Sequence, residues 1–113
     1  MKRFKNVGVL NIKGDVLKMM VDGMEEELKL ENLLNVILTN APFQTQQDSK
    51  EGALLAQAIE TGKGGEFIEL EESTHEWLKK AAEQVTPALF RVNGNVIYEY
   101  LKEGFEKIHQ PEE

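Results

Sequence analysis

The most restrictive feature of this sequence is an apolar stripe with helical spacing at residues 30–38. Its side chains stand three and four positions apart, which places them on one face of an α-helix; they are Leu30, Leu33, Leu34, Ile37 and Leu38. Asn40 and Pro42 are predicted to end this helix. Because no other segment is as apolar, we expect the helix at the centre of the core, with the other elements packed around it.

Two further helices are predicted from their terminal residues. Asp48, with Glu51 three positions later, is typical of a helix start, because the two side chains can satisfy free amide donors there. Gly62 is typical of a helix end. The next helix is predicted to begin near Ser73, which has Glu76 at the same spacing. Its inward face is expected to hold Thr74, Trp77, Leu78, Ala81, Ala82 and Val85.

Thr86 and Pro87 are predicted to close the third helix and to begin a last one that runs towards Ile108. Threonine is a common N-cap residue, and proline is favoured at the first helical position. Residues 93–95 interrupt this helix with a kink or with a break, since a glycine inside a helix costs about 1 kcal/mol relative to alanine. The apolar stripe expected here is Leu89, Val92, Val96, Tyr100 and Phe105, with Ile97 and Leu101 beside it.

The first thirty residues and one later segment have the pattern of β-strands. Residues 7–12 and 16–21 alternate imperfectly between apolar and polar side chains, with a turn expected at 13–15. Asp22-Gly23 is a strong signal for a two-residue hairpin, and residues 66–70 form a short strand or an extended link. The predicted fold class is α+β: an N-terminal β-hairpin, or a small three-stranded sheet, packed against about four helices.

Length and composition indicate one small globular domain over residues 1–113. The 113 residues are 41% hydrophobic and 29% charged, which is ordinary for a soluble protein. The absence of cysteine excludes disulfides and thiolate metal sites, and no apolar run approaches the roughly 20 residues that a membrane span needs. We therefore expect a cytoplasmic protein that makes no membrane contact, with a disordered tail at residues 109–113.

The net charge of −7 is spread unevenly along the chain. Residues 1–18 carry five basic side chains and one acidic side chain, so the remaining residues carry −11. An acidic body repels phosphates, which makes nucleic acid an unfavourable partner. The alternative hypothesis is a small regulator that contacts nucleic acid through its basic N-terminal arm and the helix after Thr86. Its candidate contacts are Lys2, Arg3, Lys5 and Arg91.

Residues 61–77 resemble a site for chemistry, but the ends of helices explain them better. The glycines of Gly62-Lys63-Gly64-Gly65 follow a predicted helix and precede a strand, the reverse of the order in a phosphate loop. His75 has no second histidine at helical spacing, which a zinc site usually has. We therefore predict no catalytic residue, no metal site and no cofactor. A small hydrolase or metal enzyme that uses His75 is a third hypothesis.

Large apolar side chains outside the expected core are candidates for partner contact. Phe43 falls in a predicted loop, and Phe105 falls near the end of the last predicted helix. Trp77, the single tryptophan, shares a helix face with Leu78, Ala81 and Ala82, so we expect it in the core, with partner contact as the alternative. The candidate contacts to a protein partner are Phe43, Trp77 and Phe105.

Several stretches share an order of apolar spacings and helix ends: LKLE at 28–31, NLLNVILTNAP at 32–42, ALLAQAIE at 53–60, EFIEL at 66–70 and PALFRVNGNVIYEYL at 87–101. Together they resemble short proteins that are encoded in bacteriophage and prophage genomes, mostly without an assigned function. The resemblance covers about residues 15–103. It departs at Lys29, where those proteins usually have a capping hydroxyl, and around residues 93–95. It supplies no site residues.

From these observations we expect a non-enzymatic phage or prophage accessory protein. It would act through protein–protein contacts, in particle assembly or on a host factor, in the host cytoplasm or attached to the virion. A homo-oligomer is expected as well, because N-terminal strands expose edges that tend to be paired or protected.

Overall fold

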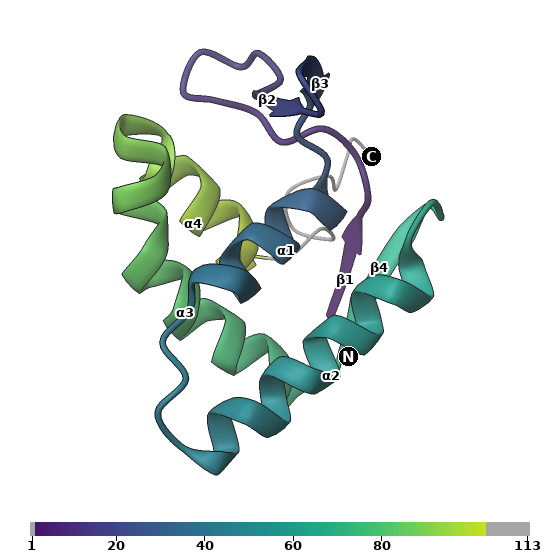
Figure 1. Cartoon of the computed structure of the whole chain (residues 1–113), viewed down its shortest axis with the longest axis vertical. Coiled ribbons are helices and arrows are strands. Elements are labelled where there is room, and N and C mark those ends of the chain that lie inside the picture. The colour runs from purple at the N-terminus through teal and green to yellow at the C-terminus, as the bar shows by residue number, and fades with distance from the viewer. Residues whose placement is uncertain (1, 104–113) are drawn as a thin grey trace.

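The computed structural model describes residues 2–103 and has an α+β fold (Figure 1). The strands are β1 (Lys2–Lys5), β2 (Lys18–Val21), β3 (Met24–Glu27) and β4 (Phe67–Leu70). The helices are α1 (Leu30–Asn40), α2 (Gln46–Gly62), α3 (Glu72–Phe90) and α4 (Gly94–Glu103), with the short 3-10 helix η1 (Arg91–Asn93) before α4. The tail predicted at residues 109–113 lies outside the described residues.

The strands form two separate antiparallel pairs. β1 pairs with β4, so that Phe4 lies opposite Ile68, while β2 and β3 form a hairpin of their own. The hairpin turn is the predicted Asp22-Gly23, whose residues have φ of 51° and 80°, as a type I′ turn requires. The strand predicted at residues 66–70 is confirmed. The alternative prediction of one three-stranded sheet is wrong, because β4 pairs with β1 and not with the hairpin.

The segment 7–12, predicted as the first strand of the hairpin, forms isolated bridges instead of a ladder. It belongs to a ring of backbone hydrogen bonds that joins Val9, Leu17 and Leu28. The Val9 N–H donates to the Leu28 carbonyl at 2.9 Å, and the Leu28 N–H donates to the Leu17 carbonyl at 2.8 Å. The Leu17 N–H closes the ring at the Val9 carbonyl, also at 2.8 Å. Each segment bonds to both of the others, so no flat sheet can extend from this point.

The N-terminus of α1 is capped by residues that precede it by more than twenty positions. Lys29, the N-cap residue, makes no side-chain cap hydrogen bond. The Leu30 N–H donates to the Val7 carbonyl at 3.0 Å, and the Glu31 N–H donates to Asn6 Oδ1 at 3.1 Å. Asn6 Nδ2 donates in return to the Glu31 carboxylate at 2.8 Å. Helix N-termini need such acceptors, and a tertiary contact replaces the local hydroxyl here.

The start of α2 differs from the prediction by one helical turn. Thr45 is the N-cap: its hydroxyl accepts from the Asp48 N–H at 3.1 Å, and the Asp48 carboxylate accepts from the Thr45 N–H at 3.0 Å. The predicted pairing of Asp48 with Glu51 is therefore wrong. Glu51 is buried, and its carboxylate accepts hydrogen bonds from Gln47 and from the Thr74 hydroxyl, both at 2.9 Å. It joins α2 to α3.

The start of α3 also lies before the predicted position. Glu71 is the N-cap residue and makes no side-chain cap hydrogen bond, so the predicted cap at Ser73 is wrong. Glu76 pairs with Lys79 instead, at 3.1 Å. The His75 N–H donates to the Glu71 carbonyl at 2.9 Å. The imidazole of His75 lies in the core, where its exposed fraction is 2%.

Helix α3 continues through Pro87, so the predicted helix start at Thr86 is wrong. The Thr86 side chain is buried, and its hydroxyl donates to the Ala82 carbonyl at 2.7 Å. Proline cannot supply the backbone hydrogen bond that a helix would direct at the Glu83 carbonyl, but Glu83 is exposed and water can reach this turn. The chain changes direction at Arg91, which has φ of 53°. The predicted interruption of the last helix therefore takes the form of a break.

Because α4 is a separate helix, its buried face differs from the predicted stripe. Ile97 and Leu101 are fully buried, whereas Leu89 and Val92 are 39% and 73% exposed. At Gly94 the first turn of α4 touches α3 so closely that an added Cβ would lie 2.8 Å from a backbone carbonyl oxygen of α3. The lack of a side chain at this position permits the contact.

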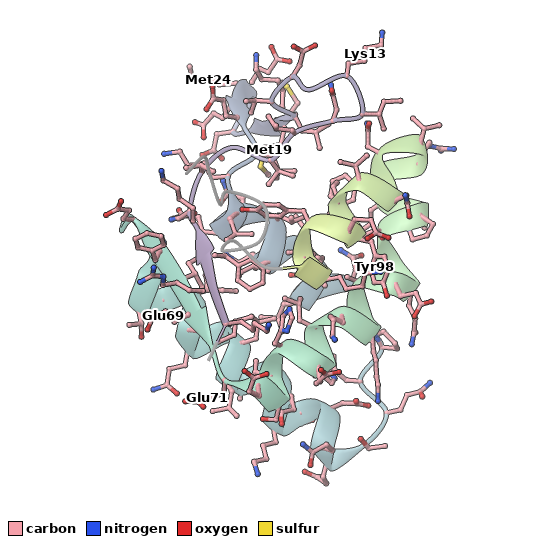
Figure 2. The ribbon with its side chains drawn as sticks, turned by 180° about the vertical axis from the view of Figure 1, so that it is seen from behind. Lys13, Met19, Met24, Glu69, Glu71 and Tyr98 are labelled. Atoms are coloured by element: carbon pink, nitrogen blue, oxygen red, sulfur yellow. The ribbon has the colours of Figure 1, made fainter. Side chains whose placement is uncertain are left out.

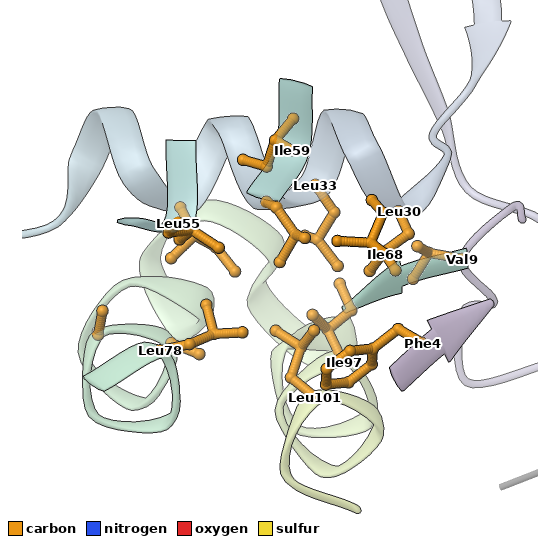
Figure 3. Close-up of a cluster of buried hydrophobic side chains, with 14 of the residues drawn as sticks. Phe4, Val9, Leu30, Leu33, Leu55, Ile59, Ile68, Leu78, Ile97 and Leu101 are labelled. Carbon is orange, nitrogen blue, oxygen red and sulfur yellow. The ribbon is translucent and has the colours of Figure 1, made fainter. Parts of the chain in front are cut away.

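The hydrophobic core lies between the helices and the face of the β1–β4 pair that carries Phe4 and Ile68 (Figures 1 and 3). The apolar stripe predicted on α1 is confirmed at four of its five positions, which are fully buried. Figure 3 shows how side chains from β1, α1, α2, β4, α3 and α4 meet there. The labelled members of this cluster are Phe4, Val9, Leu30, Leu33, Leu55, Ile59, Ile68, Leu78, Ile97 and Leu101.

Candidate protein-binding surface

An apolar groove of about 540 Å³ runs between the segment that follows β1 and helix α4. We call it the α4 groove. Most of its exposed surface is apolar, and Val7 and Leu10 in its wall are 36% and 48% exposed. Concave apolar surface of this size is typical of binding sites. The groove is lined by Val7, Gly8, Val9, Leu10, Asn95, Val96, Glu99 and Tyr100.

Local hydrogen bonds and close packing define the loop wall of the groove. Gly8 lies so close to Val16 that an added Cβ would be 2.7 Å from a methyl carbon of that residue. Asn11 closes the predicted turn, because its Oδ1 accepts from the Lys13 N–H at 2.8 Å and from the Asp15 N–H at 3.1 Å. The exposed side chains of the loop therefore sit on a hydrogen-bonded frame.

The loop is tied to the opposite wall as well. The Ile12 N–H donates to Asn93 Oδ1, in η1, at 3.1 Å. Figure 2 shows the loop that carries Lys13 beside the start of α4. Ile12 is 55% exposed, and Val92, the chain neighbour of Asn93, is 73% exposed. Two segments that are distant in the sequence thus share one apolar face.

Tyr100 and Glu99 give the groove its polar groups. The Tyr100 hydroxyl donates to the Lys5 carbonyl at 3.4 Å, and its ring centroid lies 6.2 Å from that of Phe4. Burial raises the pKa of Tyr100 to about 12. The Glu99 carboxylate lies 3.3 Å from the Lys102 ammonium group, so this side of the groove carries an ion pair.

Raising the pH should lower the stability of the protein, in part because the Tyr100 phenol loses its proton. The pKa of the phenol is about 12 in the fold against 10.0 for the free group, so the unfolded chain gives up this proton first. The contribution of Tyr100 is therefore complete below pH 10 and is lost as the pH rises to about 12, which amounts to about 3 kcal/mol. Tyr100→Phe should flatten this part of the stability curve in urea titrations. Equal slopes in wild type and Tyr100→Phe would contradict the assignment.

The aromatic residues predicted to contact a partner lie away from the α4 groove, as far as the structure describes them. Phe43 is 44% exposed, and its ring centroid lies 5.5 Å from that of Trp77. Trp77 is half-buried, packs against the core and donates from Nε1 to the Asp48 carboxylate at 3.1 Å. The hydrogen bond from the Gln44 backbone and, next to it in effect, this bond from Trp77 lower the pKa of the Asp48 carboxyl. Phe105 lies outside the described residues.

The basic residues of the nucleic-acid hypothesis are divided between two regions. Lys2, Arg3 and Lys5 lie on β1, where the Arg3 guanidinium stands 4.4 Å above the centre of the Phe67 ring. Arg91 is the first residue of η1, between α3 and α4. Figure 1 shows the connection between α3 and α4 well apart from β1. No helix begins at Thr86 to carry a recognition surface.

The groups that resemble a chemical site are used within the fold. The Gly64 N–H donates to the Glu31 carboxylate at 3.0 Å, and the hydrogen bonds from Asn6 and then Gly64 lower the pKa of Glu31. His75 Nε2 lies 2.8 Å from the Leu101 carbonyl. A carbonyl only accepts, so Nε2 carries the proton and ties α3 to α4. Within residues 2–103, no three histidine, aspartate or glutamate side chains are placed to hold a metal ion.

Sequence reasoning did not predict the α4 groove. Val96 and Tyr100 have helical spacing, which predicts that they lie on the apolar stripe of the last helix and not in the wall of a groove. Val7 and Leu10 were assigned to a β-hairpin. The available signal was the number of apolar residues in the first seventeen positions, which is more than one short strand can bury.

No helix in the described part of the chain is both long and apolar enough to span a membrane. Comparison of the chain with models of protein families, with curated proteins and with solved structures finds no match.

Proposed function

We propose that this chain is a non-enzymatic phage or prophage accessory protein that binds another protein through the α4 groove. The observation that carries the proposal is the apolar surface shared by two segments that hold each other through the Ile12–Asn93 hydrogen bond. Its most exposed members are Leu10, Ile12 and Val92. Monomeric proteins seldom leave such side chains grouped around a concave surface.

Burial of this surface supplies the driving force for association. Each square ångström of apolar surface removed from water contributes about 25 cal/mol, part of which offsets the loss of rotational and translational freedom. The hydrogen-bonded loop is already ordered, so little conformational entropy is lost on binding. The partner is a phage or host protein, met in particle assembly or in the host cytoplasm, or a second copy of this chain. The resemblance over residues 15–103 supports the phage setting.

Leu10→Arg should abolish binding while leaving the fold intact. Leu10 is 48% exposed, so the charged side chain can remain in water in the free protein but must be desolvated in a complex. A photo-cross-linking amino acid at position 10 in phage-infected or lysogenic cells should capture the partner. Binding of the captured protein should then weaken about tenfold or more with Leu10→Arg. Light scattering after size exclusion reports whether the partner is a second copy.

Phe43→Arg provides the matched control, because it adds the same charge to another exposed apolar side chain. It should leave the cross-link from position 10 and the measured affinity unchanged. Cross-linking from position 43 but not from position 10, together with loss of binding in Phe43→Arg alone, would assign the interface to the aromatic pair and reject the α4 groove.

A further inference from the structure

A second groove, of about 530 Å³, lies between β4, the C-terminal half of α2 and the start of α3. We call it the β4 groove. It shares no lining residue with the α4 groove. Its lining residues are Leu54, Gln57, Ala58, Thr61, Gly62, Glu66, Phe67, Glu69, Leu70, Glu71 and Thr74.

The register of the β1–β4 pair shows which backbone groups face this groove. The Asn6 N–H donates to the Glu66 carbonyl at 2.9 Å, in register with the ladder. Hydrogen-bonded and non-bonded pairs alternate in an antiparallel ladder, so Glu69 directs its N–H and C=O away from β1. The other edge of the sheet agrees with this parity, because the Lys5 carbonyl accepts from the Tyr100 hydroxyl on that side.

The outer edge of β4 is open at Glu69. Within residues 2–103, β1 is the only strand that pairs with β4. At Phe67 the edge is closed by α2, because a Cβ on Gly62 would lie 2.8 Å from the Phe67 carbonyl oxygen. The groove extends from this contact along β4 to Glu69 and Glu71. An open strand edge is a template for pairing with another chain.

The walls of the groove differ in chemistry. On the α2 side, Leu54 and Ala58 are four positions apart on one helix face, and Leu54 is 36% exposed. On the strand side the exposed carboxylates are Glu66, Glu69 and Glu71. Figure 2 shows Glu69 and Glu71 on the same side of the molecule. The groove thus presents apolar surface on one wall and negative charge on the other.

We infer that the β4 groove binds an extended segment of a partner protein in which basic and apolar side chains alternate. The segment adds a third strand to β4, with its backbone bonded to Glu69. Side chains of an added strand point alternately to the two faces of the sheet. Apolar side chains therefore meet Leu54 and Ala58, and basic ones meet the carboxylates around Glu69. Backbone bonding supplies affinity, and the two walls supply selectivity.

This inference goes beyond the proposed function, because the β4 groove lies across the sheet from the α4 groove. The outer edge of β4 borders the β4 groove. The opposite edge of the sheet, at β1, accepts the hydrogen bond from Tyr100 of α4. With both grooves occupied, the protein joins two partners. Loss of binding in Leu10→Arg leaves the β4 groove intact, so the two proposals fail independently.

The test uses a fluorescent peptide of alternating lysine and valine with blocked termini, and a glutamate–valine peptide for comparison. At about 50 mM salt, where charge interactions are weakly screened, the lysine peptide should bind and shift amide NMR signals of residues 54–61 and 66–71. Glu69→Lys should weaken binding about tenfold or more. Glu69→Pro removes the outward N–H without breaking the β1 ladder, and should weaken binding more than Glu69→Gln, which keeps it.

Glu83→Lys is the matched charge control, since Glu83 is exposed on α3 and does not line the groove. It should change the affinity less than threefold. Four results would overturn the inference: no binding at about 1 mM peptide, an equal loss with Glu83→Lys, equal binding of Glu69→Pro and Glu69→Gln, or shifts confined to the α4 groove. Thermal melting of each variant confirms that the fold is retained, and Glu69→Lys decides the outcome if Glu69→Pro unfolds.

Discussion

Gly94→Val is expected to lower the free energy of unfolding by about 3 kcal/mol, which corresponds to a fall in melting temperature of about 10–20 °C. A Cβ at this position would lie 2.8 Å from the Thr86 carbonyl oxygen, 3.0 Å from its carbon and 3.1 Å from Pro87 Cα. All three are backbone atoms of α3, so no side-chain rotation can relieve the overlap. The two helices would have to separate, which opens the core around Ile97. Thermal and urea unfolding measure the loss.

The sign of the effect separates this contact from ordinary helix propensity. At an unconstrained helical position, replacing glycine by alanine stabilises a protein by up to about 1 kcal/mol. Gly94→Ala should destabilise it instead, by less than valine does. Asn95→Val is the control, because Asn95 is exposed and the change costs only a few tenths of a kcal/mol in propensity. A stabilised Gly94→Ala would show that α3 and α4 are not packed this closely.

His75→Ala is expected to cost about 3 kcal/mol, from a cavity in the core and from a buried carbonyl left without its donor. The imidazole lies 5.6 Å from the Phe4 ring, centre to centre, and donates to Leu101 at 2.8 Å. This hydrogen bond joins the start of α3 to the last turn of α4. Hydrogen exchange should therefore show a larger loss of protection in α4 than in α1, because local opening follows the lost contact.

Two variants control for this prediction. Glu76→Ala removes the neighbouring surface residue, which pairs with Lys79, and should change stability by less than about 0.5 kcal/mol. His75→Phe keeps most of the packing volume but not the donor, so its loss should fall between those of wild type and alanine. Uniform loss of protection in α1 and α4 with His75→Ala would contradict a specific tie to α4.

The burial of His75 follows from the spacing of residues within α3. Residues 75, 78, 82 and 85 recur at intervals of three and four, which places them on one face of α3, and all four are buried. The histidine was instead grouped with the neighbouring glutamates as part of a helix start. A polar residue on an apolar face is the less familiar pattern, and only its hydrogen bond to Leu101 explains it.

The α4 groove could not be predicted because its two walls meet only in the fold. One wall follows β1 and the other follows a break in the last helix. The sequence allows a kink or a break at residues 93–95, and the predicted stripe through Leu89 and Val92 follows from a helix that begins at Pro87. The three residues of η1, which begins with the turn at Arg91, change the helical phase, so Ile97 and Leu101 are the buried positions. A change of phase cannot be read from apolar spacing alone.

By itself the sequence determined those features that depend on neighbours along the chain. Helical spacing at residues 30–38 is a property of one segment, and so is the Asp22-Gly23 turn, whose positive φ angles suit those residues. Both are confirmed. The α+β class followed from the same local signals.

Tertiary structure alone decided which distant groups satisfy one another. The free amides at the start of α1 are satisfied by Asn6 and Val7, and the open side of β1 is paired by β4. Two residue pairs have the spacing of a cap at the start of α2: Thr45 with Asp48, and Asp48 with Glu51. Because Glu51 is buried and bonded to Thr74, only the Thr45–Asp48 cap forms. The reason is physical: buried backbone and polar groups must all find partners. Which partners they find depends on the whole packed chain.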